Sequence, residues 1–285
     1  MNDPDLAFIT EIIKKLERDI DEEFLNTNFA TLREKKAFLT KVQSLLGAYG
    51  AEIRNATIEE IGREWLSSEN LAKTALNSLP TNLFNNPNND VLKALVTLES
   101  IKDEVGAEID LLFLNSRSKL IQSFNLLESN LKRSVMAEVA SGSITGNPMI
   151  EIGARIEKEL KKSGITKFTL LDKNGNIRNY SVEYKAREYA QHGIISSRMQ
   201  ATIKMAVSMG YDLVKIDDHA GSVIPISPMC KPHNGKTVSI TGMTKGYPKL
   251  ESVMWDGRYK YGSGISHPWC RHSLTIYIPT SVQFD

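Results

Sequence analysis

Apolar residues recur at helical spacing through most of the first half of this chain, and no other feature of the sequence constrains the fold as strongly. Steps of three and four residues place the first set on one face of a helix: Leu6, Ile9, Ile13, Leu16, Ile20 and Phe24. The same spacing predicts a second helix from about 31, ending at the glycines of 47–50, and a third over about 57–79. Thr57 and Glu60 have the spacing of a capping box, which predicts that the third helix begins there.

A longer helix is expected over roughly 90–140, after a loop rich in asparagine and proline, with a weak interruption at Gly106. Its apolar stripe consists of Leu120, Phe124, Leu127 and Leu131. Such a stripe packs against helices of the same chain or against a partner protein. The sequence leaves both alternatives open.

The pattern changes in the second half. In chain order it predicts a short helix over about 148–162, a hairpin of strands 167–171 and 177–180 joined through an Asn-Gly turn, a helix over 181–209 ending at Gly210, a strand over 211–216, and a loop-rich region over 217–285 with a last strand at about 273–278. The Gly/Ser-rich stretch 141–148 predicts a boundary between a helical domain, 1–145, and a second domain, 146–285. We therefore expect an α+β fold, with a long-helical N-terminal half followed by a compact mixed α/β, loop-rich C-terminal module.

Charge and chemistry are divided unequally between the halves. Residues 1–150 hold 16 Lys+Arg and 22 Asp+Glu, whereas residues 151–285 hold 19 and 12, so the net charges are about −6 and +7. All five histidines and both cysteines lie in the second half.

Two cysteines cannot form a disulfide scaffold in 285 residues, and the sequence has neither a signal-peptide pattern nor an apolar run long enough to cross a bilayer. We expect a protein of the reducing cytosol with no membrane segment.

The cysteines belong to two short clusters that suit a metal site. The first is Cys230-Lys-Pro-His233, and the second, His267-Pro-Trp-Cys270-Arg-His272, follows about 34 residues later. Because zinc takes thiolate and imidazole ligands, and because two such turns can close a tetrahedron, the sequence predicts a structural zinc site. The candidate ligands are Cys230, His233, His267, Cys270 and His272, and His219 is a further candidate.

Other interpretations of these residues remain open. Cys230 and Cys270 can be buried thiols without a metal, or a disulfide in an oxidising setting such as outside a cell. A Cys–His nucleophile pair is also possible, although spacing alone assigns no orienting residue. Arg187 lies either on a solvated helix face or in a buried contact with the Cys/His loops. The Gly-rich segment 259–264 lacks the context of a phosphate-binding loop and is expected to be an ordinary loop.

Four motifs in fixed order resemble the phage minor capsid protein 2 family, which is similar to the head-morphogenesis proteins of the Mu F type. They are Gly210-Tyr-Asp-Leu-Val-Lys-Ile-Asp-Asp-His219, Ser227-Pro-Met-Cys-Lys-Pro-His-Asn-Gly-Lys236, Tyr247-Pro-Lys-Leu250 and Gly264-Ile-Ser-His-Pro-Trp-Cys-Arg-His-Ser273. The resemblance covers about residues 165–280 and includes the helix that carries Tyr184 and Arg187.

The resemblance implies a virion protein that is made in the bacterial cytoplasm and incorporated in few copies into the phage head near the portal vertex. Its expected partners are the portal protein and other head proteins, with packaged DNA as a further partner and an oligomeric arrangement at the vertex. The implied role is head assembly, DNA packaging or DNA delivery, without catalysis. The alternative is a phage-delivered enzyme or toxin with an ADP-ribosyltransferase-like fold or a metal-dependent activity, for which Glu251 and His219 are the residues to test.

Overall fold

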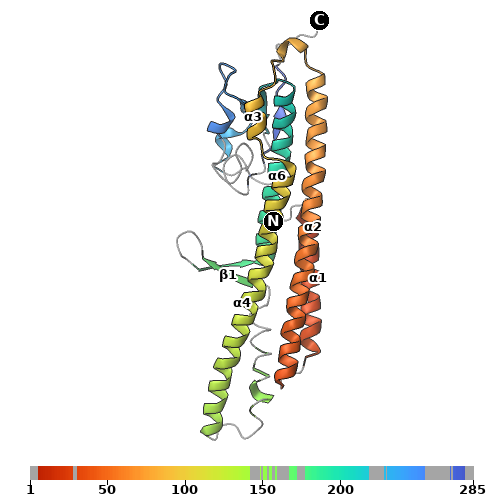
Figure 1. Ribbon diagram of the computed structural model, residues 1–285. Helices are drawn as coiled ribbons and strands as arrows, with labels where there is room; N and C mark the ends of the chain where they lie inside the picture. The colour runs from red at the N-terminus through yellow and green to blue at the C-terminus, as the bar shows by residue number, and fades with distance from the viewer. Residues whose placement is uncertain are drawn as a thin grey trace. The chain divides into compact units, whose positions relative to one another are not determined.

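The computed structural model describes residues 6–27, 31–141, 148, 150–152, 154–155, 158, 167–171, 177–217, 228, 230–253, 270 and 272–279 (Figure 1). These residues form long helices, a two-stranded hairpin and a three-stranded antiparallel sheet, which confirms the predicted α+β class. The chain divides into two compact units: unit 1 comprises Met1–Ala56 and Ala107–Arg187, and unit 2 comprises Thr57–Gly106 and Glu188–Asp285. The stretch expected to separate residues 1–145 from 146–285 lies mostly outside the described residues, so that division stays a prediction.

Unit 1 begins with helix α1, Ala7–Leu25, whose buried face carries the predicted apolar residues. The buried side chains are Ile9, Ile12, Ile13, Leu16, Ile20 and Phe24. The ring of Phe24 meets that of Phe38 edge to face, with 6.0 Å between centroids. The spacing of three and four residues therefore predicted the packed face of this helix correctly.

Helix α2, Leu32–Asn77, is continuous, so the predicted break at 47–50 and the predicted helix start at Thr57 are wrong. The glycines at this place serve packing instead. A Cβ atom on Gly47 would lie 2.0 Å from the guanidinium of Arg117, and one on Gly50 would lie 2.7 Å from the ring of Phe113. The close approach of helix α4 requires residues without side chains at these positions, which spacing along one helix does not reveal.

The predicted helix over 90–140 is two helices, α3 (Asn89–Ala94) and α4 (Leu98–Ala140). The Asn88 side chain caps α3 by accepting a hydrogen bond from Val91 N at 3.0 Å. Thr97 Oγ1 caps α4 by accepting one from Ser100 N at 3.1 Å. The interruption therefore lies at 95–97, where these caps favour a new start, and α4 runs through Gly106 unbroken.

The predicted hairpin is present in unit 1. Strand β1 (Lys167–Leu171) pairs antiparallel with β2 (Ile177–Ser181), with Thr169 opposite Asn179. The turn between them lies outside the described residues. So does most of the expected helix over 148–162, although residues 148, 150–152, 154–155 and 158 are helical.

Unit 2 is built around a three-stranded antiparallel sheet in the order β4-β3-β5, with helix α6, Val182–Ser208, contributing its later turns to the core. The strands are β3 (Leu213–Ile216), β4 (Thr237–Ser239) and β5 (Leu274–Ile276). A Cβ atom on Gly193 of α6 would lie 2.6 Å from the side chain of Ile61, so α6 and α2 approach closely here. The core side chains include Leu76, Ile195, Met199, Ile203, Val207, Val214, Ile216, Val238, Ile240, Leu274 and Ile276.

Helix α6 ends at Ser208, one residue before the predicted end at 209, and Gly210, the glycine predicted to follow the helix, has a φ of 75°. Its carbonyl accepts a hydrogen bond from Asn85 N at 2.9 Å, which ties the loop before α3 to the end of α6. None of the described helices is both long and apolar enough to span a membrane.

Candidate metal centre

The topology of the small sheet explains how two cysteines 40 positions apart come together. Strands β4 and β5 flank β3, and both are antiparallel to it. The first residue of β4 is opposite Lys215, and the first residue of β5 is opposite Ile216. Both strands therefore begin at the carboxyl end of β3, and the segments that precede them meet there.

The first segment begins with Cys230 and continues as a 3-10 turn, Lys231–His233. His233 N donates to the carbonyl of Cys230 at 2.9 Å, and Gly235, with a φ of 70°, then reverses the chain toward β4. The carbonyl of Lys236 accepts a hydrogen bond from Ile216 N at 2.8 Å. The turn is thereby fixed to the end of β3.

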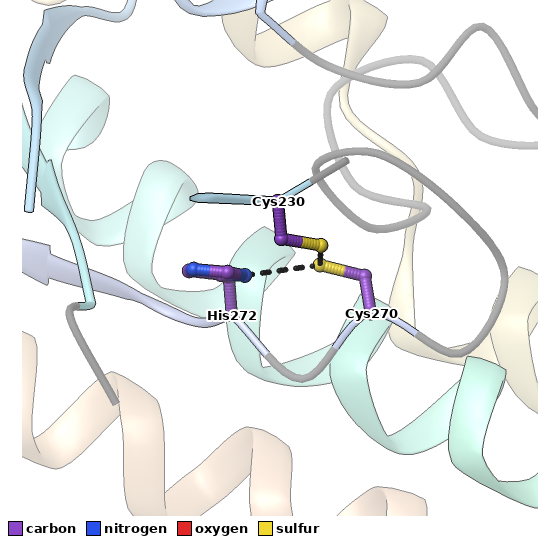
Figure 2. A group of neighbouring side chains, drawn as sticks. All are labelled: Cys230, Cys270 and His272. Atoms are coloured by element: carbon purple, nitrogen blue, oxygen red, sulfur yellow. Dashed lines mark hydrogen bonds between the residues drawn. The ribbon is translucent and has the colours of Figure 1, made fainter. Parts of the chain in front are cut away.

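The second segment carries Cys270 and His272 into β5. It is fixed to the same end of β3 because Asp217 N donates to the carbonyl of Ser273 at 3.0 Å. Figure 2 shows the two sulfur atoms pointing toward each other and one ring nitrogen of His272 pointing toward the sulfur of Cys270.

The distances define a compact group of three ligand-type side chains. The sulfurs of Cys230 and Cys270 are 3.6 Å apart, and Cys270 Sγ lies 3.3 Å from His272 Nδ1. The three side chains are almost completely buried, with exposures of 2% for Cys230 and 1% for Cys270 and for His272. A disulfide bond is about 2.05 Å long, so the two sulfurs are unbonded and both cysteines are free thiols.

Asn234 orients the ring of His272. Its Oδ1 lies 3.2 Å from His272 Nε2. Because an amide oxygen only accepts hydrogen bonds, Nε2 is the donor of this contact, and Nδ1 faces the sulfur of Cys270. Asn234 is the member of this cluster that the sequence analysis missed; its position directly after the Cys-x-x-His turn was the available signal.

Of the five predicted ligands, the structure therefore brings three together. His233 is half-buried and lies outside the group whose ligand atoms are all within 4.8 Å of one another. Burial lowers the pKa of its imidazole, and the charge of Lys236 lowers it further, so the ring is neutral at pH 7. His267 and His219 lie outside the described residues. Metal binding by these side chains stays a prediction.

The cluster also contains the three groups of a cysteine nucleophile with its base and orienting group, namely the thiol of Cys270, the imidazole of His272 and the amide of Asn234. Burial argues against that use, because reactive cysteines lie in partly exposed surroundings whereas Cys270 is 1% exposed. The arrangement suits a closed structural site better than an open catalytic one.

The other residues singled out in the sequence have different surroundings. Arg187 is largely buried, and its guanidinium contacts Thr10 of α1 at 3.3 Å and Glu183 at 3.5 Å, within unit 1. Glu251 is half exposed, and its carboxylate forms an ion pair with Lys249 at 2.6 Å. The Gly-rich segment 259–264 lies outside the described residues.

Unit 2 also contains a pocket of about 560 Å³. It lies at the amino end of β3, where the loop before α3 and the first residues of α3 face Asp212 and the residues after β4. Asp212 does not point a free carboxylate into this pocket, because it accepts hydrogen bonds from Ser239, Thr241 and Thr244. The residue holds the turn after β4 in place.

One known protein family matches nearly the whole chain. A family model described as phage minor capsid protein 2 matches residues 30–283. The match includes the long helices α2 and α4 as well as the Cys/His segments, and it reaches well beyond the region 165–280 in which the motifs lie. No curated protein and no solved structure matches the chain. The chain belongs to the phage minor capsid protein 2 family, whose members are structural proteins of phage virions.

Proposed function

We propose that this protein is a low-copy component of the phage head near the portal vertex, where it acts in head assembly, DNA packaging or DNA delivery without catalysis. The observation that carries the proposal is the family match, which spans both the helical region and the Cys/His module. The partners are the portal protein and other head proteins, contacted in an oligomeric arrangement, and assembly takes place in the host cytoplasm.

The outer surface of α4 supports a role in protein contacts. Four large apolar side chains of this helix are more than half exposed: Leu111, Leu114, Leu126 and Met136. At about 100° per residue, they lie within a sector of about 120° around the helix axis. Apolar side chains that are exposed on one face of a helix provide a surface for another protein to pack against.

The enzyme alternative receives less support from the described residues. Glu251 is the only glutamate after residue 188, and its ion pair with Lys249 lies on the surface rather than in the pocket of unit 2. The excess of basic residues after position 150 favours an electrostatic contact with DNA. A DNA-binding role would appear as an affinity that falls steeply with salt concentration.

The proposal is tested in a phage that encodes this chain, with the gene interrupted by a nonsense mutation. We expect infectious particles to fall by several orders of magnitude, and electron microscopy to distinguish the step that fails. Aberrant heads indicate a failure of head assembly, and empty heads indicate a failure of DNA packaging. Normal filled particles that do not infect indicate a failure of DNA delivery. Normal titres from the interrupted phage would contradict the proposal.

A matched pair of variants separates surface contacts from folding. Leu111→Glu with Leu114→Glu places charge on the exposed face of α4, whereas Leu111→Met with Leu114→Met keeps the face apolar. Only the glutamate pair is expected to fail in complementation, although both proteins should unfold at the same temperature as the natural chain because these positions are exposed. Equal complementation by both pairs would exclude the exposed face of α4 as the contact surface.

A further inference from the structure

The spacing of the Cys230, Cys270 and His272 ligand atoms is close to that of a tetrahedral zinc centre. With zinc–sulfur distances of about 2.3 Å and zinc–nitrogen distances of about 2.05 Å, tetrahedral angles place two sulfurs about 3.8 Å apart and a sulfur about 3.6 Å from a nitrogen. The corresponding separations are 3.6 Å between the two sulfurs and 3.3 Å between Cys270 Sγ and His272 Nδ1. An ion at their centre requires shifts of only a few tenths of an ångström.

The hydrogen bond from His272 to Asn234 provides a second observation. A metal-bound histidine usually donates its other ring N–H to an oxygen acceptor, which fixes the ring orientation and its tautomer. His272 has this arrangement, because Nε2 donates to Asn234 Oδ1 and Nδ1 points toward the sulfurs. Asn234 thus holds the ligand nitrogen in position.

His233 provides a third, independent observation. Its Nδ1 atom is buried and has no hydrogen-bond partner among the described residues. A buried polar atom without a partner is rare and calls for an explanation. Side chains at positions i and i+3 of a 3-10 turn lie on the same side, and the turn Lys231–His233 therefore places His233 on the side of Cys230. Rotation of the side chain would bring this nitrogen toward the group.

From these three observations we infer that the chain binds one zinc ion through Cys230, Cys270 and His272, with His233 as the fourth ligand. Two thiolates and two imidazoles form a donor set that suits zinc, and four protein ligands in a buried position form a structural site. The ion joins the segments before β4 and β5 across the end of β3. A sheet with strands of only three or four residues benefits from such a link, because each short strand forms few ladder hydrogen bonds with its neighbours. The inference does not depend on the proposed role in the phage head.

The experiment uses the full chain, produced with zinc in the medium and purified under reducing conditions without chelators. Elemental analysis is expected to find about one zinc ion per chain, and modification of the two cysteines with a thiol-specific mercurial is expected to release it. Cobalt substituted for zinc should give sulfur-to-cobalt charge-transfer absorption. These readouts use the natural sequence and do not require a variant to fold.

Variants identify the ligands. Cys230→Ser, Cys270→Ser and His272→Gln should lose the metal, and His233→Asn should weaken zinc affinity by at least about tenfold. The control is His192→Gln, a buried histidine of α6, which should keep about one zinc ion per chain. Protein without zinc after exposure to the ion, zinc that stays bound when both cysteines are blocked, or a Cys230–Cys270 disulfide in the purified protein would overturn the inference. Unchanged zinc affinity in His233→Asn would overturn the assignment of the fourth ligand.

Discussion

Replacing Glu128 with leucine is expected to lower the free energy of unfolding by about 3–5 kcal/mol, because it leaves a buried ammonium group without its carboxylate. Lys35 of α2 is 1% exposed, and its Nζ lies 3.2 Å from Glu128 Oε1 on α4. Glu128 also contacts the more exposed Lys132, at 3.1 Å. Replacing Lys35 with methionine should therefore cost less, since Glu128 keeps one cationic partner.

The double variant Lys35→Met/Glu128→Leu tests the explanation. Replacing both members of a buried pair with apolar residues of similar size removes the unpaired charge, so its stability should return to within about 1–2 kcal/mol of the natural protein. Lys132→Met serves as the control for the half-exposed partner and should change stability by less than about 1 kcal/mol. Urea denaturation measures all four variants. A double variant as unstable as the sum of its single variants would contradict this account.

The pH dependence of the same pair has a defined sign. Burial raises the pKa of Glu128, but hydrogen bonds from Lys132 and Lys35 outweigh this effect, and the pKa lies below its ordinary value of 4.5. The pair therefore stabilises the protein above pH 4.5, the ordinary pKa of the carboxyl group. Its contribution is lost as the pH falls through the lower pKa of the folded state. The difference between the natural protein and Glu128→Leu should accordingly be larger at pH 7 than at pH 3.

Replacing Asp212 with asparagine is the second change with a large expected effect, about 2–3 kcal/mol. Its carboxylate accepts hydrogen bonds from Ser239 Oγ at 2.5 Å, Thr244 Oγ1 at 2.6 Å and Thr241 N at 2.8 Å. An amide carries no charge and has one accepting oxygen, so it cannot accept from all three groups as the carboxylate does, and the charge-assisted hydrogen bonds are lost. The turn that follows β4 loses its anchor, and both chemical denaturation and thermal unfolding should show the loss.

Acid should reduce this difference as well. Burial raises the pKa of Asp212, but the hydrogen bonds from Ser239, Thr244 and Thr241 outweigh this effect. The pKa therefore lies below its ordinary value of 3.8. The natural protein thus loses this contribution only as the pH falls below that value, and the two proteins should converge there. Asp90→Asn is a matched control, because Asp90 lines the same pocket but is exposed. An effect of Asp90→Asn as large as that of Asp212→Asn would refute the role assigned to the hydrogen bonds.

Local patterns in the sequence predicted most of the secondary structure. The stripe from Leu6 to Phe24 gave the buried face of α1, and Gly210 marked the end of α6. The hairpin strands β1 and β2 matched their predicted ranges to within one residue. These elements are determined by spacing and turn chemistry, which are properties of short segments.

The errors arose where contacts between distant segments decide the outcome. Gly47 and Gly50 look like helix breakers in the sequence, but Arg117 and Phe113 of α4 occupy the space beside them, so packing keeps α2 continuous. Thr57 is completely buried inside that helix instead of capping a new one.

The candidate site was predictable in part for the same reason. The spacing of Cys230 and His233, and of Cys270 and His272, pointed to a shared cluster because each pair lies in one short segment. The sequence could not show that β4 and β5 both start at the carboxyl end of β3, which is what brings the two cysteines together. Nor could spacing show that Asn234 holds His272, since that contact spans 38 positions.

The most direct test of the proposed function is peptide-level mass spectrometry of purified, DNA-filled particles, with copy numbers calibrated against the major capsid protein. The account predicts that this chain is present in intact particles, in far fewer copies than the major capsid protein, and that it remains with the portal when heads are disrupted gently. Absence of the chain from both proheads and filled particles, together with its presence in the lysate, would contradict the assignment to the phage head.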